Sequence, residues 1–337
     1  MRITIRDVSE AAGVSFKTVS RVLNNERHVR PATRERVEAA MKALNFRPSY
    51  AARALAGARS FQIALIYDNP SPYYIHNIQL GVRARCVEDR IRLIVQPCDL
   101  TSDGLSAEIG GLIDETHVDG VILAPPLGDV RAVTEELERR GIAYIRIAAA
   151  DPAPAERRVT MDDAAAAADM TRHLIDLGHR RIGFLTGHPD HVAARDRLIG
   201  YRSAMAAAGI AEMPGLVAEG RFDFESGAAA AAVLLASDPR PTAIFASNDD
   251  MAAGALAAAH ARGIAVPDEL SIAGFDDIDL ARAVWPPLTT MRQPIRDIAY
   301  AAADLLLDRE GTGAGKPPLP PYQLIVRGST GPVPAGS

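Results

Sequence analysis

Apolar positions near the N-terminus follow the spacing of short helices. In the opening segment ITIRDVSEAAGVSFKTVSRVLN, Val8, Ala11 and Ala12 have the 3/4 spacing of a buried helix face. Thr4 is predicted to cap this first helix through its side-chain oxygen. Gly13 is predicted to end the helix and permit a tight turn. The pattern therefore predicts a short helix joined by a tight turn to a second short helix.

The second helix is predicted to begin after a capping Ser15. Val19, Val22 and Leu23 then point toward the first helix. The outer face is polar and basic and consists of Phe16, Lys17, Ser20 and Arg21. Two angled helices with such a face are typical of a helix-turn-helix that enters the DNA major groove. The alternative interpretation is a surface helical hairpin with solvated charges.

A third helix and a short helical segment complete the N-terminal part. Pro31 suits the first turn of the helix TRERVEAAMKALNF. Its predicted apolar face consists of Val37, Ala40, Met41 and Leu44. After Pro48, residues 49–56 predict one more short helix, which is too short to be stable alone. We therefore expect a headpiece over residues 1–46 and a hinge helix with its linker over residues 47–59.

The remainder of the chain alternates β-branched runs with Ala- and Leu-rich helical stretches. The predicted strands form two series, 61–67, 91–97, 118–124 and 141–147, then 180–187, 216–220, 242–248 and 270–276. Such alternation predicts parallel sheets, because each crossover needs a dozen or more residues. The expected fold is thus an all-α helix-turn-helix headpiece plus an α/β core of two doubly wound parallel-sheet lobes.

The core is expected to span residues 60–330. The segment 288–294 and the helix that follows it are expected to return to the first lobe. Lobe 1 is therefore expected to comprise about residues 60–160 and 289–330, and lobe 2 about residues 161–288.

The charge of the chain is divided between its two ends. The whole sequence has 37 Lys+Arg against 42 Asp+Glu, a net charge of −5. Residues 1–59 contain 12 Lys+Arg and 5 Asp+Glu, a net of +7, which leaves 25 against 37, a net of −12, for the rest. A basic headpiece on an acidic body is typical of a DNA-binding domain fused to a second function.

Several other classes of protein lack support in the sequence. No apolar run approaches the roughly 20 residues of a membrane span, and no signal-peptide pattern follows Arg2. Cys86 and Cys98 form no disulfide framework, so we expect a cytoplasmic protein. GTGAGK at 311–316 lacks the Ser or Thr of a phosphate loop and predicts a linker, and HPDH at 188–191 predicts a polar loop at the cleft rather than a metal site. No nucleophile motif is present, and no cofactor is expected.

The headpiece and hinge motifs resemble those of one known family. GVSFKTVSRVLN, TRERVEAAMKALNF and ARALAGARS are similar to the lactose-repressor (LacI/GalR) family of bacterial transcription regulators. Later matches cover the rest of the chain, with DLGHRRIGFLTG, RLIGYRSAM, AIFASNDDMAAGAL, ELSIAGFDDIDLA and PPLTTMRQP. The resemblance implies a repressor whose core is like a periplasmic sugar-binding protein, with a ligand cleft between two lobes.

The resemblance assigns DNA contacts to the headpiece and hinge. Phe16, Lys17 and Arg21 match positions that read base edges, and Leu55 matches a hinge leucine that enters the minor groove. Lys and Arg suit guanine O6 and N7, and an apolar wedge kinks DNA at a base step. The full expected DNA-binding set is Thr4, Ser15, Phe16, Lys17, Thr18, Ser20, Arg21, Asn24, His28, Tyr50, Arg53, Ala54 and Leu55. If the hinge folds only on operator DNA, Leu55→Gly should weaken operator binding.

Polar and aromatic residues at predicted strand ends describe the expected effector. Carboxylates and amides accept and donate to hydroxyl groups, and aromatic rings stack on the apolar face of a sugar. The family resemblance places effector contacts at Asp68, Tyr73, Arg197, Asn248, Asp276 and Gln293, and Tyr74 and Asp249 complete the expected effector-binding set. For Asp276 and its neighbour Asp277 the alternative is a loop cap, and for the two tyrosines it is interface packing.

Two departures from the family pattern affect these expectations. Arg30 stands where the family has a capping Ser, which is expected to weaken the start of the third helix or add a phosphate contact. Ala148, with Arg146 nearby, stands after the strand at 141–147 where the family often has an Asp. Recognition of a sugar hydroxyl from that strand is therefore not expected.

The overall prediction is a sequence-specific transcriptional repressor, not an enzyme. Its expected partners are pseudo-palindromic double-stranded operator DNA, a small saccharide and a second copy of itself, with no metal and no membrane. The segment GPVPAGS after residue 330 has no leucine heptad, so we expect a dimer rather than a tetramer. The alternative is a binding module or sugar-processing enzyme in which the basic headpiece is incidental.

Overall fold

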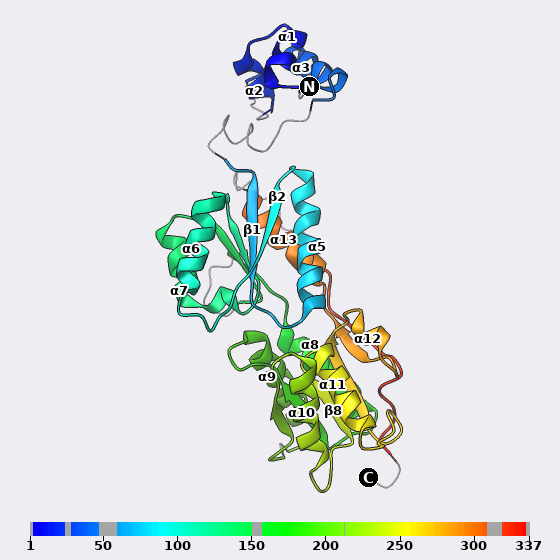
Figure 1. Cartoon of the computed structure of the whole chain (residues 1–337). Coiled ribbons are helices and arrows are strands. Elements are labelled where there is room, and N and C mark those ends of the chain that lie inside the picture. The colour runs from blue at the N-terminus through cyan, green and yellow to red at the C-terminus, as the bar shows by residue number, and fades with distance from the viewer. Residues whose placement is uncertain are drawn as a thin grey trace.

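The computed structural model comprises a small helical headpiece and two α/β lobes (Figure 1). It describes residues 3–23, 28–46, 59–149, 157–211, 213–308 and 319–334. The predicted contacts Asn24, Tyr50, Arg53, Ala54 and Leu55 lie outside the described residues.

The headpiece contains three helices around one apolar cluster. They are α1 (Ile5–Ala12), α2 (Phe16–Leu23) and α3 (Pro31–Ala43). As predicted, Thr4 caps α1: its Oγ1 accepts from the Asp7 amide, and the Asp7 carboxylate accepts from the Thr4 amide. Gly13 ends the helix with φ 59°.

The headpiece core confirms the predicted apolar faces, with one exception. Its buried members are Ile5, Val8, Ala12, Val19, Val22, Val37, Ala40 and Phe46. Ala11 is exposed, because Ile5, Val8 and Ala12 complete the stripe of α1 that packs inward. The Arg36 guanidinium of α3 donates to the Ala12 carbonyl at 2.7 Å and ties the third helix to the end of the first. The packing of α3 against α1 is thus held by burial and by this bond.

The start of α3 lacks a side-chain cap. Arg30 occupies the cap position and makes no side-chain hydrogen bond to the first turn. The backbone amide of Thr33 in that turn donates to the Arg30 carbonyl. In Arg30→Ser the hydroxyl would accept from that amide and stabilise the helix by about 1 kcal/mol. Native-state hydrogen exchange of α3 amides in the full chain should slow about fivefold. Arg30→Ala is the control and should show no slowing, since alanine offers no acceptor.

The first lobe is a five-stranded parallel sheet of order β2-β1-β3-β4-β5. Its strands are β1 (Gln62–Tyr67), β2 (Arg92–Pro97), β3 (Val121–Leu123), β4 (Tyr144–Ile147) and β5 (Arg158–Val159). Its helices are α5 (Pro72–Glu88), α6 (Leu105–Thr116), α7 (Arg131–Arg139) and α13 (Ile295–Leu307), with a 3-10 turn at Leu127–Asp129. Ile63 and Leu65 pack under α5 and α13, whereas Ala64 and Ile66 pack under α6 and α7, so both sheet faces are buried.

The second lobe is a six-stranded sheet of order β11-β10-β9-β8-β6-β7, parallel except for β11. Its strands are β6 (Ile182–Thr186), β7 (Val217–Glu219), β8 (Ala243–Ala246), β9 (Ser271–Asp276), β10 (Thr289–Arg292) and β11 (Gln323–Ile325). Its helices are α8 (Asp163–Asp176), α9 (Val192–Ala207), α10 (Phe224–Leu235), α11 (Asp249–His260) and α12 (Leu280–Ala283). Helices α8 and α9 cover one face, and α10 and α11 cover the other.

The return of the chain to the first lobe differs from the prediction. The eight predicted strands are present, but β10 lies in the second sheet, where it pairs with β9 from Thr289↔Ala273 to Arg292↔Asp276. The strand β11 and residues 329–331 also lie in lobe 2, so assigning 289–293 and 323–330 to lobe 1 was wrong. The buried side chains of β10 extend the second sheet, and among the described residues after β10 it is α13, packed on α5, and Leu319 that return to lobe 1 (Figure 1).

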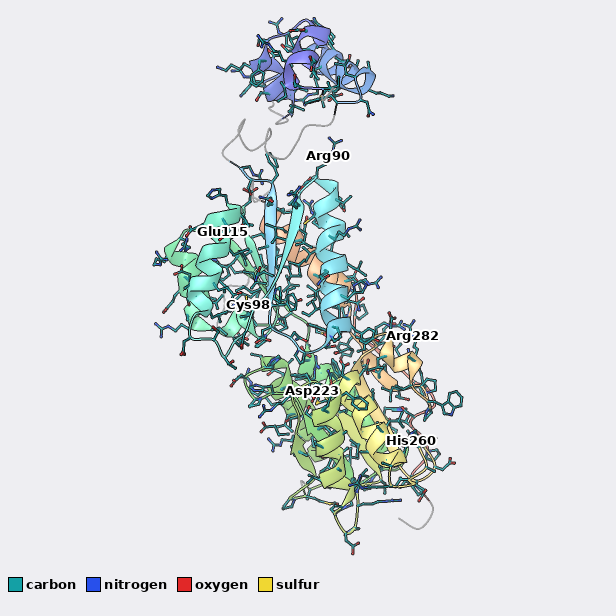
Figure 2. All side chains as sticks on the ribbon, viewed as in Figure 1. Arg90, Cys98, Glu115, Asp223, His260 and Arg282 are labelled. Atoms are coloured by element: carbon teal, nitrogen blue, oxygen red, sulfur yellow. The ribbon has the colours of Figure 1, made fainter. Side chains whose placement is uncertain are left out.

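Two further observations bear on the class of protein. Within the described ranges, no helix is long and apolar enough to cross a membrane. Both cysteines are free thiols in lobe 1, with Cys86 buried and Cys98, labelled in Figure 2, half-buried.

Candidate functional site

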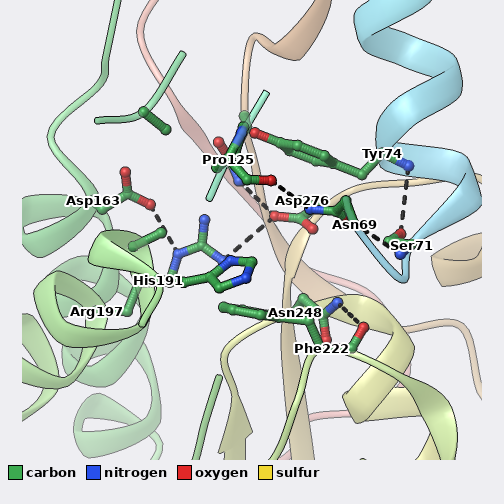
Figure 3. Close-up of a pocket in the computed structure, with 13 residues that line it drawn as sticks. Asn69, Ser71, Tyr74, Pro125, Asp163, His191, Arg197, Phe222, Asn248 and Asp276 are labelled. Atoms are coloured by element: carbon green, nitrogen blue, oxygen red, sulfur yellow. Dashed lines mark hydrogen bonds and ion pairs between the residues drawn. The ribbon is translucent and has the colours of Figure 1, made fainter. Parts of the chain in front are cut away.

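A cleft between the two lobes gathers polar side chains from both (Figure 3). Its lining residues are Asn69, Ser71, Tyr74, Pro125, Ala148, Asp163, His191, Ala193, Arg197, Phe222, Asn248, Asp276 and Gln293. The space they bound, including its opening to solvent, is about 440 Å³. A ligand bound there would contact side chains of both lobes.

The site lies at strand ends and helix starts, as expected for open α/β sheets. Ser71 caps α5 and Asn248 caps α11, where the Asn248 Oδ1 accepts from the Met251 amide at 2.9 Å. Asp163 is the first residue of α8, and Asp276 ends β9. The folding of the two sheets therefore brings these side chains together from segments far apart in the sequence.

Arg197 of α9 is the central cation of the pocket and is only 4% exposed. Its Nε donates to Asp163 Oδ1 at 2.8 Å, and its Nη1 lies 3.7 Å from Asp276 Oδ1 and donates to the Ser247 carbonyl. The guanidinium lies 3.8 Å from the centroid of the Phe275 ring. Among the described residues no acceptor engages Nη2, which leaves this nitrogen as a donor for a ligand.

Burial sets the protonation of the acidic and phenolic groups. It raises the pKa of Asp276 to about 7, against the opposing effects of the Arg197 charge and the Gln293 hydrogen bond. It also raises the pKa of Asp163, which Arg197 partly offsets, and it raises the pKa of Tyr74 far enough to keep the phenol protonated. The pocket therefore offers carboxylates as acceptors and the phenol as a donor.

Neutral and aromatic groups complete the walls. Burial lowers the pKa of His191 to about 4, so its imidazole is uncharged at neutral pH. The His191 and Phe222 rings lie 5.0 Å apart and form an apolar wall on the lobe 2 side. Tyr74 contributes a third ring, from lobe 1. Aromatic rings on both walls with polar groups between them are suited to a ligand with an apolar face and hydroxyl edges.

The structure brings together five of the eight predicted effector residues and leaves three outside. Tyr74, Arg197, Asn248, Asp276 and Gln293 line the pocket. The other three, Asp68, Tyr73 and Asp249, do not.

Each of the three outside residues has a different position. Asp68 accepts from the Leu100 amide at 2.8 Å, and Tyr73 is 40% exposed, on a different side of α5 from its neighbour Tyr74. Asp249 is fully buried behind the pocket. Adjacent helix positions point about 100° apart, so one member of such a pair faces the cleft.

Sequence reasoning missed eight lining residues as effector contacts. They are Asn69, Ser71, Pro125, Ala148, Asp163, His191, Ala193 and Phe222. Asn69 lies two residues after the end of β1 and His191 lies in the loop expected at the cleft, so position in the sequence could have indicated both. Phe222 has no such signal. Arg146 points away from the pocket, because it donates to the Gly128 carbonyl at 2.8 Å.

The headpiece presents the predicted outer face of α2. Phe16 is 58% exposed, and Lys17 and Arg21 are exposed beside it. Ser15 caps α2 by accepting from the Thr18 amide at 3.1 Å. Of the other described members of the set, Ser20 is half-buried on α2 and His28 is exposed.

Comparison with known proteins now decides the family. Residues 4–49 match the model for bacterial regulatory proteins of the lacI family, and residues 171–330 match that for a periplasmic binding protein-like domain. The HTH-type transcriptional regulator DegA of Bacillus subtilis (strain 168) is 35% identical over 99% of both chains. The chain belongs to the LacI family.

Solved structures of LacI-family regulators share the whole architecture. The lac repressor dimer bound to operator and the anti-inducer ONPF superposes with a TM-score of 0.79 at 29% identity, covering 98% of this chain and all of that one. The complex of the transcriptional regulator CelR with cellobiose has a TM-score of 0.72 at 32% identity, covering 97% and 100%. The headpiece and both lobes are thus those of this family.

Proposed function

We propose that this protein is a sequence-specific transcriptional repressor whose affinity for operator DNA is controlled by a small, uncharged, polyhydroxylated effector, a sugar or sugar derivative. The effector binds in the cleft between the two lobes. The observation that carries the proposal is the pairing, on one chain, of a basic helix-turn-helix with a buried polar cleft.

The chemistry of the cleft supports an uncharged polyol. Asp163 and Asp276 face a single guanidinium, so an added phosphate or carboxylate would lie among buried carboxylates. Hydroxyl groups can donate to Asp276 and Asn248 and accept from Arg197. The CelR structure holds cellobiose, a neutral sugar of this class.

The proposed DNA-binding form is a cytoplasmic homodimer on a pseudo-palindromic operator. One headpiece reads a few base pairs, and a two-fold dimer doubles the site. Lobe 1 offers a surface for self-association, since β2 is an edge strand and carries the exposed Val95, and Val87 at the end of α5 is a second exposed apolar residue. The lac repressor relative was solved as a dimer on operator.

The second candidate function is a sugar-processing enzyme. We propose that the protein is not an enzyme, because its relatives are transcription regulators and both pocket carboxylates are engaged by Arg197. Incubating the protein with neutral disaccharides and measuring release of reducing sugar tests this directly. Turnover that is lost in Asp276→Asn would support the enzyme instead.

Fluorescence anisotropy on the DNA upstream of the protein's own gene tests the proposed function. We expect saturable binding that competitor DNA of random sequence does not abolish, and a shift of the binding curve by one member of a panel of neutral sugars. Asp276→Asn should lose the sugar effect, whereas Asp279→Asn, an exposed neighbour, should keep it. Binding of equal strength to random DNA would contradict the repressor assignment.

Effector affinity should rise with pH across neutrality. The ionised Asp276 carboxylate accepts a hydrogen bond from a hydroxyl group of the effector. Its pKa is raised to about 7, so protonation below that pH competes with the ligand. As the pH falls, we expect the Kd for the effector to rise by about tenfold per pH unit well below pH 7. Above pH 7 the Kd should be constant. The charged groups around Asp276 are Arg197, Asp163, Asp249 and Asp250.

Calorimetric titration between pH 5.5 and 8.5 measures this profile. His191 titrates near pH 4 and stays neutral throughout the window. The control is Asp276→Asn. Any effector affinity that this variant retains should not change with pH. A wild-type Kd that does not change with pH would contradict the role of Asp276 as an acceptor.

A further inference from the structure

Two consecutive carboxylates end β9 and point to different places. Asp276 lines the cleft, whereas Asp277 lies outside the cleft lining and its side chain is fully buried. Both residues have positive φ, 113° for Asp276 and 55° for Asp277. L-residues rarely adopt this conformation, so the surrounding contacts must hold the backbone turn in place.

Three arginines from three segments surround the Asp277 carboxylate. Arg292 Nε at the end of β10 lies 2.7 Å from Oδ2, and Arg282 Nη2 on α12 lies 3.5 Å from the same oxygen (Figure 2 labels Arg282). Arg327, after β11, binds Oδ1 through Nη2. Charge-assisted bonds to three cations hold a buried carboxylate far more firmly than a single pair does.

Asp276 and Asp277 are bound by two adjacent residues at the end of β10, the strand next to β9. Arg292 is the register partner of Asp276 and binds Asp277, and the next residue, Gln293, donates from Nε2 to the Asp276 carboxylate. The Gln293 amide also donates to the Asp276 carbonyl at 3.4 Å. The direction of Asp276 is therefore coupled to the anchoring of Asp277.

A second buried acid holds the turn from the other side. Asp249 Oδ1 accepts from the Thr290 hydroxyl at 2.6 Å, and its Oδ2 accepts from the Ile278 amide at 3.0 Å. The Thr290 hydroxyl oxygen accepts from the Asp277 amide at 3.4 Å. Asp249, which was predicted from the sequence to contact the effector, therefore lies behind the pocket and braces this turn.

We propose that Asp277 is a positioning residue: held by Arg282, Arg292 and Arg327, it fixes the backbone turn that aims Asp276 into the effector cleft. Asp277 itself touches no effector. For the effect on ligand binding this inference rests on the proposed function, but the placement of Asp276 does not depend on which ligand the cleft takes.

Asp277→Asn tests the proposal, because the amide keeps the shape of the side chain and removes its charge. The matched control is Asp279→Asn, the same change two residues later at an exposed position. The first readout needs no ligand and is the ¹³C-carboxyl titration of Asp276, assigned with Asp276→Asn. We expect a midpoint near 7 in the wild type and the control, and a fall toward the ordinary value of about 3.9 in Asp277→Asn.

Hydrogen exchange provides the second readout. The amides of Asp277 and Ile278 should exchange at least tenfold faster in Asp277→Asn, while amides of β6, two strands away from β9 in the same sheet, keep their wild-type rates. The third readout uses cellobiose, glucose and ribose as probes. For any that binds, Asp277→Asn should raise the Kd at least fivefold, with operator affinity in the absence of sugar unchanged.

The outcomes separate this inference from the proposed function. An unchanged Asp276 midpoint with unchanged exchange overturns the positioning role, whatever the sugars do. Faster exchange across the whole sheet, β6 included, also overturns it, because Asp277 would then only stabilise the fold. Loss of the Asp276 midpoint shift with no sugar bound by the wild type supports positioning and counts against a sugar effector.

Discussion

Replacing Arg197 by methionine should abolish the effector response and destabilise the second lobe by about 3–5 kcal/mol at pH 8. The side chain is 4% exposed and binds Asp163 while lying 3.7 Å from Asp276. Its removal leaves two buried carboxylates without a cation. The pocket would also lose the Nη2 donor that no acceptor among the described residues engages.

The sign of the pH dependence makes this prediction specific. Without Arg197 the pKa values of both acids rise further above their unfolded values, because burial alone then acts on them. A carboxyl with a raised folded pKa is destabilising above that pKa and neutral below its unfolded pKa. The deficit of Arg197→Met relative to wild type should therefore shrink as the pH falls from 8 to 5.

Urea unfolding at a series of pH values measures the deficit. Arg195→Met is the matched control, since it lies on the same helix and is exposed. We expect less than 0.5 kcal/mol for the control, as for most surface substitutions. Equal deficits for the two variants, or a deficit at Arg197 that does not change with pH, would count against a central cation.

Removing either basic side chain of the α2 face should weaken operator binding in a sequence-dependent way. Lys17→Ala and Arg21→Ala should each cost about 1–3 kcal/mol on operator DNA, with preference relaxed at particular base pairs. The basis is their exposure on the outer face of α2, next to Phe16. The change in affinity on random DNA should be much smaller.

A control for charge alone is available on the same headpiece. Lys42→Ala removes one positive charge from α3 at an exposed position. This change should weaken binding to operator DNA and to random DNA by similar, small factors. It should also make the affinity slightly less dependent on salt. If Lys17→Ala and Arg21→Ala behave in this way too, the two residues contact phosphate only.

The sequence predicted the parts of the fold that depend on local chemistry. The capping Thr4, the turn at Gly13 and the apolar stripes are encoded within a few residues, as are the strands. The placement of β10 was not predictable in this way. Whether Thr289 to Arg292 pairs with β9 or returns to the other lobe depends on long-range packing, and no local pattern distinguishes the two.

The candidate site was predictable by region but not by side chain. Strand ends located the cleft, yet the direction of a side chain follows from backbone angles that the sequence does not reveal. Tyr74 faces the pocket and Tyr73 does not, and Asp276 faces it while Asp249 braces the turn behind it. The positive φ of Asp276 reverses the expected alternation of the strand at its last residue.

Linkage between operator and sugar tests the central claim most directly. For the neutral sugar that shifts the operator curve, the Kd for operator is measured with and without saturating sugar, and the Kd for sugar with and without operator. Coupling of two sites on one protein requires the two ratios to be equal, and about 5–150-fold is typical. Our account predicts equal ratios in this range for the wild type and ratios near one for Asp276→Asn. A sugar that binds the cleft with measurable affinity yet leaves the operator Kd unchanged in the wild type would contradict the account.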